Sequence, residues 1–450
     1  MNHILTIASV ALRFAAAIGL VVFALHWRSP ILASMRMPAL AAFIIVAVLF
    51  ITIEICRLLR KRQPTRFALS SFAILLIASG GLALTLFYEA QFHWQRHQVL
   101  HADAASTERL GRHLIVGYRD LGKLRDLVER RAIAGIFVTA HNVQGKDADT
   151  IRGEIASLQD IRKKQNLPPL LISTDQEGGI VSRMSPPLPR RGSLGDIVRK
   201  HRDKTERSKA VQTFASDQGR ALADLGFNLN FAPVIDLNHN IVNEDDRYTR
   251  IFQRAISDDP HVVTAMAGEY CTGLLQTGVH CTLKHFPGLG RVVEDTHLND
   301  ADLTMPVETL AATDWVPFRL LMHHAGAFTM LGHARLTAID KDTPASFSKA
   351  VVSGLLRGKW NHDGVLITDD FNMSPAYASG SGIGGAAVLA LNAGVDLILI
   401  SYDGDQFYPA MQSLLRADAA GLLQREQLER SDRRLGRMMS TSAATAMGTQ

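Results

Sequence analysis

Three long apolar stretches lie within the first 90 residues of this 450-residue chain and restrict that part to very few folds. They cover about residues 4–27, 38–56 and 67–88, and the last carries no charged residue. At about 1.5 Å of rise per helical residue, each can cross roughly 30 Å of hydrocarbon. We therefore expect residues 1–90 to form three transmembrane helices, and the lipid bilayer to be a partner of the chain.

The first stretch has a charged residue near its middle and lies at the N-terminus. Arg13 interrupts it, so the arginine is expected either to reach toward the near interface or to precede a shorter span. A cleaved signal peptide is the alternative interpretation. We disfavour it, because no small-residue cleavage site precedes Arg28 and two further apolar stretches follow.

The charges beside these stretches predict their orientation. Between the second and third stretches lie five cations: Arg57, Arg60, Lys61, Arg62 and Arg66. The loop between the first and second has only Arg28 and Arg36. Positive loops stay on the cytoplasmic side, so everything after the third stretch should lie outside. We expect a multi-pass protein of a bacterial inner membrane whose remaining domain faces the periplasm. The net charge of +5 belongs partly to this loop, so it does not indicate a nucleic-acid partner.

The rest of the chain has the pattern of an α/β protein. Residues 91–108 read as a polar helical linker, and from 109 short apolar runs alternate with stretches of helical periodicity. Such alternation indicates a parallel sheet. Seven or eight units over residues 109–436 favour a TIM-like (β/α)8 barrel, with a doubly wound sheet as the alternative. Residues 437–450 are expected to form a flexible tail.

Three cysteines are present: Cys56, Cys271 and Cys281. Cys271 and Cys281 could pair outside the cytoplasm, but no disulfide framework is evident, so we expect free buried thiols. No Cys/His spacing resembles a zinc site, and no metal or organic cofactor is implied.

Polar residues follow several of the apolar runs directly. They are Asp175-Gln176-Glu177, Asp236, Lys284-His285, His333 and Asp369-Asp370. Strand ends meet on one face of a barrel, so these side chains are expected to form a single site. A loop containing one proline and two glycines follows Lys284-His285 and leads to Asp295-Thr296-His297. Titratable groups gathered on such a loop indicate chemistry.

At these positions the chain resembles glycoside hydrolase family 3, in its single-domain β-N-acetylhexosaminidase branch. The resemblance covers about residues 109–435. The motifs that carry it, in order, are Asp175-Gln-Glu-Gly-Gly-Ile-Val-Ser-Arg183, Asn230-Phe-Ala-Pro-Val-Ile-Asp236, Lys284-His-Phe-Pro-Gly-Leu-Gly290, Asp295-Thr-His297, Pro344-Ala-Ser-Phe-Ser348, Ile367-Thr-Asp-Asp-Phe-Asn-Met373 and Ala390-Leu-Asn-Ala-Gly-Val-Asp396.

The resemblance implies a retaining mechanism with an unusual acid. Asp369 occupies the position of the nucleophile, and a retaining glycosidase also needs an acid that protonates the leaving oxygen. His297 matches the histidine that this branch uses, and Asp295 matches the aspartate that orients it. A histidine can donate a proton near neutral pH. Asp370 is the rival nucleophile, but neighbours in a strand point to opposite faces, so we expect it to be a structural acceptor.

The resemblance also implies residues that bind the non-reducing sugar. They are Asp175, Arg183, Arg250, Lys284 and His285. Asp236 and His333 are expected to support the site, and Glu177 to shape its turn. Leu289 stands where the family commonly has histidine, which could weaken a polar contact of the loop.

The function expected from these residues is an exo-β-N-acetylglucosaminidase that removes terminal β-linked GlcNAc, for which peptidoglycan fragments are candidate substrates. A phosphorylase is one alternative, because a histidine acid places no second carboxylate near an incoming phosphate. A non-catalytic, membrane-anchored glycan sensor is the other.

Overall fold

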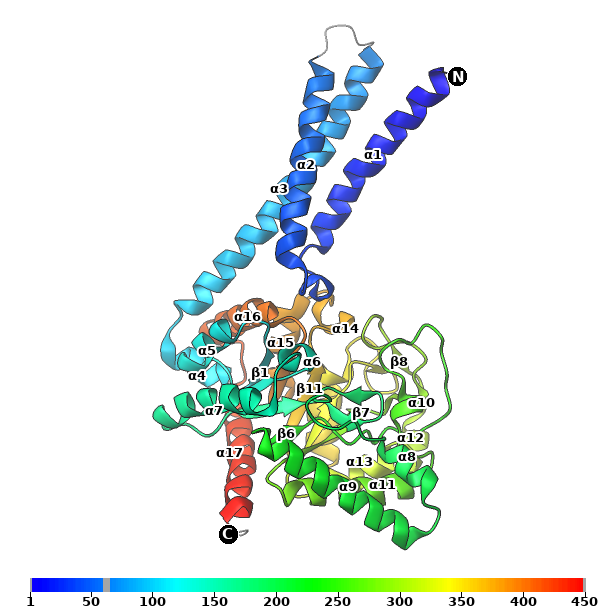
Figure 1. The fold of residues 1–450 in the computed structure, drawn as a ribbon, viewed down its shortest axis with the longest axis vertical. Helices are drawn as coiled ribbons and strands as arrows, with labels where there is room; N and C mark the ends of the chain where they lie inside the picture. The colour runs from blue at the N-terminus through cyan, green and yellow to red at the C-terminus, as the bar shows by residue number, and fades with distance from the viewer. Residues whose placement is uncertain (1, 60–64, 448–450) are drawn as a thin grey trace. The chain divides into compact units, whose positions relative to one another are not determined.

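The computed structural model describes residues 2–59 and 65–447, so part of the basic loop at Arg60, Lys61 and Arg62 lies outside the described residues. The chain divides into two compact units, Met1–His101 and Ala102–Gln450 (Figure 1). Each unit has its own apolar core.

The first unit consists of three long helices. They are α1 (Asn2–His26), α2 (Arg36–Leu58) and α3 (Thr65–Leu100), with the short η1 (Pro30–Leu32) between the first two. All three are long and apolar enough to be candidate membrane spans. Small residues let them approach closely: a Cβ on Gly81 of α3 would lie 3.0 Å from the backbone of Leu20 in α1.

Polar side chains inside this unit pair with one another. Arg13 of α1 forms an ion pair with Glu54 of α2, which is fully buried, and donates to Ser71 Oγ of α3 at 2.7 Å. At the other end of α1, Trp27 Nε1 donates to Glu89 Oε2 at 2.8 Å. Arg13 therefore turns inward to partners on two other helices, which neither interpretation of the interrupted first stretch anticipated.

The second unit contains an eight-stranded parallel sheet, which confirms the expected α/β class. Its strands pair with their neighbours in chain order, and the last strand, β12, pairs with the first, β1. The one break in this series lies between β6 and β7, which are the two end strands of the sheet. The strands are β1 (Leu114–Gly117), β2 (Gly135–Phe137), β3 (Leu171–Thr174), β6 (Leu229–Asn230), β7 (Cys281–Phe286), β9 (Ala327–Leu331), β11 (Leu366–Asp370) and β12 (Leu397–Ile400).

Bridges between β6 and β7 nearly close this sheet into a barrel. Parallel bridges join Leu229 to His280 and Val234 to Lys284. Between them the backbone N–H of Thr282 donates to the oxygen of Ala232 at 2.8 Å. An open doubly wound sheet would leave both edge strands unpaired, so that alternative is wrong. Alternate strand residues fill the inside, as in other barrels; examples are Ile115, Leu171, Phe328, Ile367 and Leu399.

Helices cover the outside of the sheet (Figure 1). The longer ones are α5 (Leu121–Glu129), α7 (Ala148–Lys164), α9 (Lys204–Asp224), α11 (Pro260–Leu275), the π-helix η4 (Ala350–Lys359), α15 (Gly382–Ala393), α16 (Phe407–Ala419) and α17 (Arg425–Met447). Shorter elements lie before or between them: α4 (Ala104–Gly111), α6 (Ala140–Val143), β4 (Gln176–Gly178), β5 (Val181–Ser182), α8 (Leu194–Lys200), α10 (Ile251–Arg254), η2 (Leu289–Arg291), β8 (Asp302–Leu303), α12 (Val307–Ala312), α13 (Trp315–Leu321), β10 (Arg335–Leu336), η3 (Ala345–Phe347), α14 (Ser374–Tyr377) and η5 (Gly404–Gln406).

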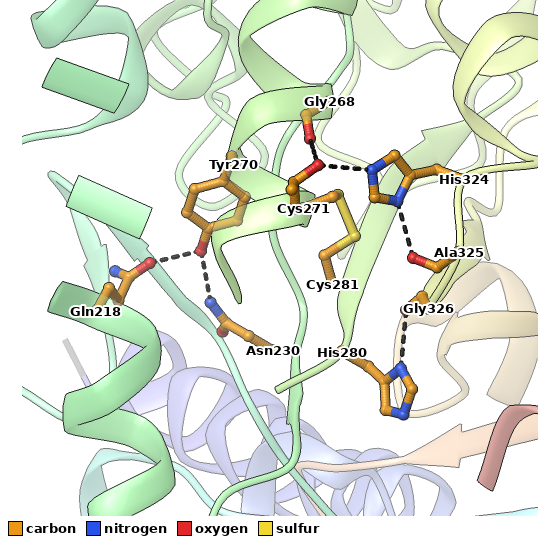
Figure 2. Close-up of a disulfide and its surroundings, with 11 residues drawn as sticks. Gln218, Asn230, Gly268, Tyr270, Cys271, His280, Cys281, His324, Ala325 and Gly326 are labelled. Atoms are coloured by element: carbon orange, nitrogen blue, oxygen red, sulfur yellow. Dashed lines mark hydrogen bonds between the residues drawn. A yellow bond between two sulfur atoms is a disulfide. The ribbon is translucent and has the colours of Figure 1, made fainter. Parts of the chain in front are cut away.

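A disulfide bond joins Cys271 of α11 to Cys281 of β7, so the expectation of free thiols is wrong for this pair (Figure 2). The helix turns back onto the strand that follows it, which brings the two Cα atoms to 5.3 Å although they are ten positions apart in sequence. Nearby, Tyr270 Oη donates to Gln218 Oε1 at 2.5 Å and accepts from Asn230 Nδ2 at 2.9 Å. Cys56 is a free thiol with an exposed side chain.

Candidate active site

The carboxyl ends of the strands bring together the polar residues that follow the apolar runs. Asp175 directly follows β3, and Lys284 and His285 belong to β7. The others follow or end three further strands: Asp236 after β6, His333 after β9, and Asp369 and Asp370 at the end of β11. Parallel strands end at one rim of a barrel, so these side chains occupy one face.

A buried ion network lies at the ends of β3 and β7. Lys284 Nζ is 2.7 Å from both Asp175 Oδ1 and Glu177 Oε1. Arg254, from α10, donates to the two Glu177 oxygens at 3.0 and 2.7 Å. The side chain of Asp175 is 23% exposed, against 3% for Lys284 and 7% for Glu177. Asp175 is therefore the carboxylate of this network that remains open to a ligand.

The network keeps its members charged. Burial alone would raise the pKa of Glu177, but Arg254 and Lys284 outweigh it and hold that pKa at about 2. Burial would likewise lower the pKa of Lys284, yet Asp175 and Glu177 raise it above its ordinary value. Glu177 is thus ionised and enclosed at neutral pH, which suits a structural anion and not a proton donor.

Sequence reasoning missed Arg254. Its guanidinium is buried, binds Glu177, and has Nη2 3.4 Å from His285 Nε2. Arg250, the arginine that was expected in the site, is partly buried and has its Nε 3.4 Å from the backbone oxygen of Asp246. The two arginines are four residues apart, and Arg254 is distinguished by its burial and by its contacts with Glu177 and His285, which are distant in sequence.

Arg183 lies beside Asp175 through the β4–β5 hairpin. The backbone N–H of Arg183 donates to the oxygen of Asp175 at 3.0 Å, and the arginine is exposed. The hairpin therefore places Asp175 and Arg183, the two residues predicted to bind the sugar, at the same part of the rim.

Asp236 fastens His285 and the glycine loop to the barrel. Its Oδ2 lies 2.7 Å from His285 Nδ1 and accepts the backbone N–H of the same residue at 3.1 Å. Its Oδ1 accepts the backbone N–H of Leu289 at 2.7 Å. A side chain on Gly290 would overlap the oxygen of Leu237, so the loop needs glycine there. The side chain of Leu289 is buried, and the bond to Asp236 comes from its backbone N–H, so the loop is held through its backbone.

Asp369 lies among three imidazoles. Burial alone would raise its pKa, but electrostatic attraction to His285, His333 and His297 outweighs burial and leaves the pKa below its usual value. The backbone N–H of Asp370 also donates to Asp369 Oδ1 at 2.8 Å. The carboxylate is therefore ionised at neutral pH, as a nucleophile must be.

Asp370 is fully engaged in holding the barrel rim together. Its Oδ1 accepts from the backbone N–H of Ser401 at 2.8 Å and from Asn372 Nδ2 at 2.9 Å. Its Oδ2 accepts from Ser401 Oγ at 2.5 Å and from the backbone N–H of Tyr402 at 3.2 Å. Burial nevertheless raises the pKa of Asp370. These bonds join β11 to the chain after β12, which is the structural role expected for this residue.

Asp295 and His297 form a hydrogen-bonded pair. His297 Nδ1 lies 3.1 Å from Asp295 Oδ1, and the backbone N–H of His297 donates to the same oxygen at 3.0 Å. Asp295 Oδ2 accepts the backbone N–H groups of Arg247 and Tyr248 at 3.0 and 3.1 Å. Burial alone would raise the pKa of Asp295, but its bonds to His297 lower it to about 2. The aspartate is thus a fixed anion that orients the ring.

The loop of His297 reaches the strand of Asp369. The backbone N–H of Ser374 donates to the oxygen of His297 at 2.9 Å. Ser374 begins α14, only a few residues after Asp369. Residues far apart in sequence therefore place an imidazole and an ionised carboxylate at one rim. Among residues 2–59 and 65–447, no group of three or more His, Cys, Asp or Glu side chains could hold a metal ion.

The barrel part of the chain is similar in sequence to known proteins. The family described as "Glycosyl hydrolase family 3 N terminal domain" matches residues 106–438. The chain is 35% identical over 297 residues to beta-hexosaminidase LpqI of Mycobacterium tuberculosis, which covers 65% of this chain and 72% of that protein. It is 34% identical over 283 residues to a beta-hexosaminidase of Xylella fastidiosa, covering 62% and 78% respectively.

Solved structures agree with these matches. A glycoside hydrolase family 3 beta-N-acetylglucosaminidase from Paenibacillus superposes with a TM-score of 0.68 at 30% identity, over 75% of this chain and 62% of that one. A family 3 glycosyl hydrolase from Mycobacterium smegmatis superposes with a TM-score of 0.65 at 31% identity, over 76% and 98%.

Proposed function

Because the chain belongs to glycoside hydrolase family 3, and is therefore a glycoside hydrolase, we propose that it is a retaining exo-β-N-acetylglucosaminidase. Its substrate is a glycan with terminal β-linked GlcNAc, for which peptidoglycan fragments are candidates. The observation that carries the proposal is the hydrogen bond from Ser374 to His297, since it brings the loop of the acid to the strand of Asp369. The names of the similar proteins support the choice of sugar.

The proposed reaction has two steps. Asp369 attacks the anomeric carbon and forms a glycosyl-enzyme while the imidazolium of His297 gives its proton to the departing oxygen. Water then attacks that carbon, gives its proton to His297 and releases Asp369. Asp295 stays ionised throughout and stabilises the imidazolium.

The terminal sugar is held by the ion network and its neighbours. Asp175 accepts from sugar hydroxyls, while Lys284 and His285 bind the same ring. Arg183 contacts it from the hairpin, and Arg250 from the connection before α10. The uncharged 2-acetamido group distinguishes GlcNAc from glucose.

A panel of aryl β-glycosides with and without the 2-acetamido group tests this function. We expect turnover of the GlcNAc glycoside, and loss of at least about a thousandfold in Asp369→Asn with unchanged folding by circular dichroism. Preference for glycosides without the acetamido group would refute the proposed substrate. A wild type that binds the sugar without turning it over, with binding unchanged in Asp369→Asn, would point instead to the sensor.

The imidazole acid favours one second candidate, a phosphorylase. No carboxylate serves as acid beside the departing group, so an incoming phosphate would meet less repulsion. Product analysis with and without phosphate separates the two functions, because only a phosphorylase releases a sugar 1-phosphate.

We also propose that residues 1–90 anchor the enzyme in a bacterial inner membrane, with a linker over 91–108 and a TIM-like barrel over 109–436 exposed to the periplasm. The flexible tail expected over 437–450 is wrong as far as Met447, because α17 continues to that residue. Two observations support the proposal. A basic loop lies between the second and third of three candidate spans, and the barrel unit contains a disulfide, which is typical of oxidising compartments. Reporter fusions at Arg62 and at the C-terminus test the topology. A cytoplasmic C-terminus would contradict it.

A further inference from the structure

Tyr248 presents an exposed ring beside the proposed acid. Tyr248 is 56% exposed, and its ring centroid lies 5.4 Å from that of His297. The two rings are tilted by 46°. A tyrosine ring offers a ligand a large contact area and a hydroxyl, and only two side-chain torsions must be fixed for it to do so.

The backbone on either side of Tyr248 is fixed. The N–H of Tyr248 donates to Asp295 Oδ2 at 3.1 Å, and that of Arg247 donates to the same oxygen at 3.0 Å. Thr249, which is buried, bonds to the other oxygen of Asp295 at 3.1 Å. The backbone that carries the exposed ring is thus anchored, so little backbone entropy is lost when a ligand covers the ring.

The position of the acid decides which part of the substrate meets this ring. His297 protonates the oxygen between the terminal sugar and the group that leaves. The terminal sugar occupies the ion network and Asp369, so the departing group lies on the exposed side of His297. We propose that Tyr248 is the platform for a departing sugar ring, and that it selects glycans over GlcNAc glycosides with small departing groups. The inference rests on the proposed function.

The chemistry of a sugar ring fits such a platform. One face of a pyranose consists of C–H groups and can pack against an aromatic ring, while its hydroxyls stay in water or reach the tyrosine hydroxyl. A methyl group in the same place covers little of the ring. The expected substrates are therefore β-linked di- and oligosaccharides.

Two substrates with alkoxide leaving groups test the platform: N,N′-diacetylchitobiose and methyl β-GlcNAc. Both need protonation by His297, so they differ mainly in what can stack on Tyr248. In Tyr248→Ala we expect kcat/KM for the disaccharide to fall roughly five- to tenfold more than for the methyl glycoside. Tyr248→Phe keeps the ring and should retain most of the selectivity. Val242→Ala, an exposed change in the same connection, should leave both rates unchanged.

Each other outcome has a distinct meaning. An equal loss for the two substrates in Tyr248→Ala would overturn the platform and assign the ring to positioning His297. No loss for either would overturn it as well. A wild-type enzyme that cleaves neither substrate would refute the proposed function, and the platform with it.

Discussion

The hydroxyl of Thr249 lies 3.1 Å from Asp295 Oδ1 and also accepts the backbone N–H of Thr296 at 3.1 Å. On its other side, the backbone oxygen of Thr249 accepts from Arg254 Nη1 at 2.8 Å. Arg254 belongs to the ion network that includes Asp175 and Lys284. One buried threonine thus connects the proposed sugar site with the loop of the proposed acid.

Thr249→Val should weaken acid catalysis in particular. Removing the hydroxyl leaves Asp295 short of one hydrogen bond, and we expect a loss of about tenfold in kcat/KM for methyl β-GlcNAc. The loss should be smaller for a dinitrophenyl glycoside, whose leaving group departs without a proton. Thr249→Ser keeps the hydroxyl and should restore the rate. Equal losses on both substrates would contradict this role.

Arg254→Lys should be more damaging than Arg250→Lys. Lysine cannot reproduce the two parallel bonds that the guanidinium makes to Glu177, so the buried carboxylate would lose a partner. We expect kcat/KM to fall about a hundredfold in Arg254→Lys and severalfold at most in Arg250→Lys. Urea unfolding of both variants separates stability from activity. The reverse order would restore Arg250 as the principal arginine of the site.

The loss of unfolding free energy at acid pH should depend on Glu177. Its pKa is about 2 in the folded protein against 4.5 ordinarily, so the unfolded chain binds the extra proton as pH falls. Its contribution is therefore present above about pH 4.5 and lost between there and about pH 2. The unfolding free energy of Glu177→Gln should fall less steeply over that range, although this variant is less stable at pH 7 by about 3 kcal/mol. Calorimetry at several pH values checks this, and parallel profiles would exclude it.

The disulfide between Cys271 and Cys281 should stabilise the barrel unit. For a loop of about ten residues the restriction of the unfolded chain is worth roughly 3 kcal/mol. We expect Cys271→Ala/Cys281→Ala to lower the melting temperature by several degrees, with the remaining activity unchanged at 25 °C. Reductant should lower the melting temperature of the wild type and leave the double variant unaffected. Cys56→Ala is the matched control, since its thiol is free.

Local signals made much of the barrel and its rim predictable. Apolar runs marked the strands, and the polar residues directly after them, such as Asp175 and Asp369, are placed by strand geometry alone. The Asp295–His297 pairing is also local, because two residues on one loop cannot move far apart. Asp370 followed from the alternation of side chains along a strand.

Features that depend on packing between distant segments were not predictable. The separation of Cys271 and Cys281 is visible in the sequence, but the angle at which α11 returns onto β7 is not. Arg250 and Arg254 look alike until Glu177 approaches one of them. Likewise, nothing local pairs Arg13 with Glu54, which lies on another helix.

That pairing of Arg13 with Glu54 has a consequence for biogenesis. In a bilayer, α1 on its own would carry an unneutralised guanidinium among lipid tails, and α2 on its own a bare carboxylate. The two charges can pair only after α2 has been synthesised, and Arg13 can donate to Ser71 only after α3 has been synthesised. We therefore expect α1 to enter the bilayer together with α2 and α3. A chain truncated after α1 should insert poorly.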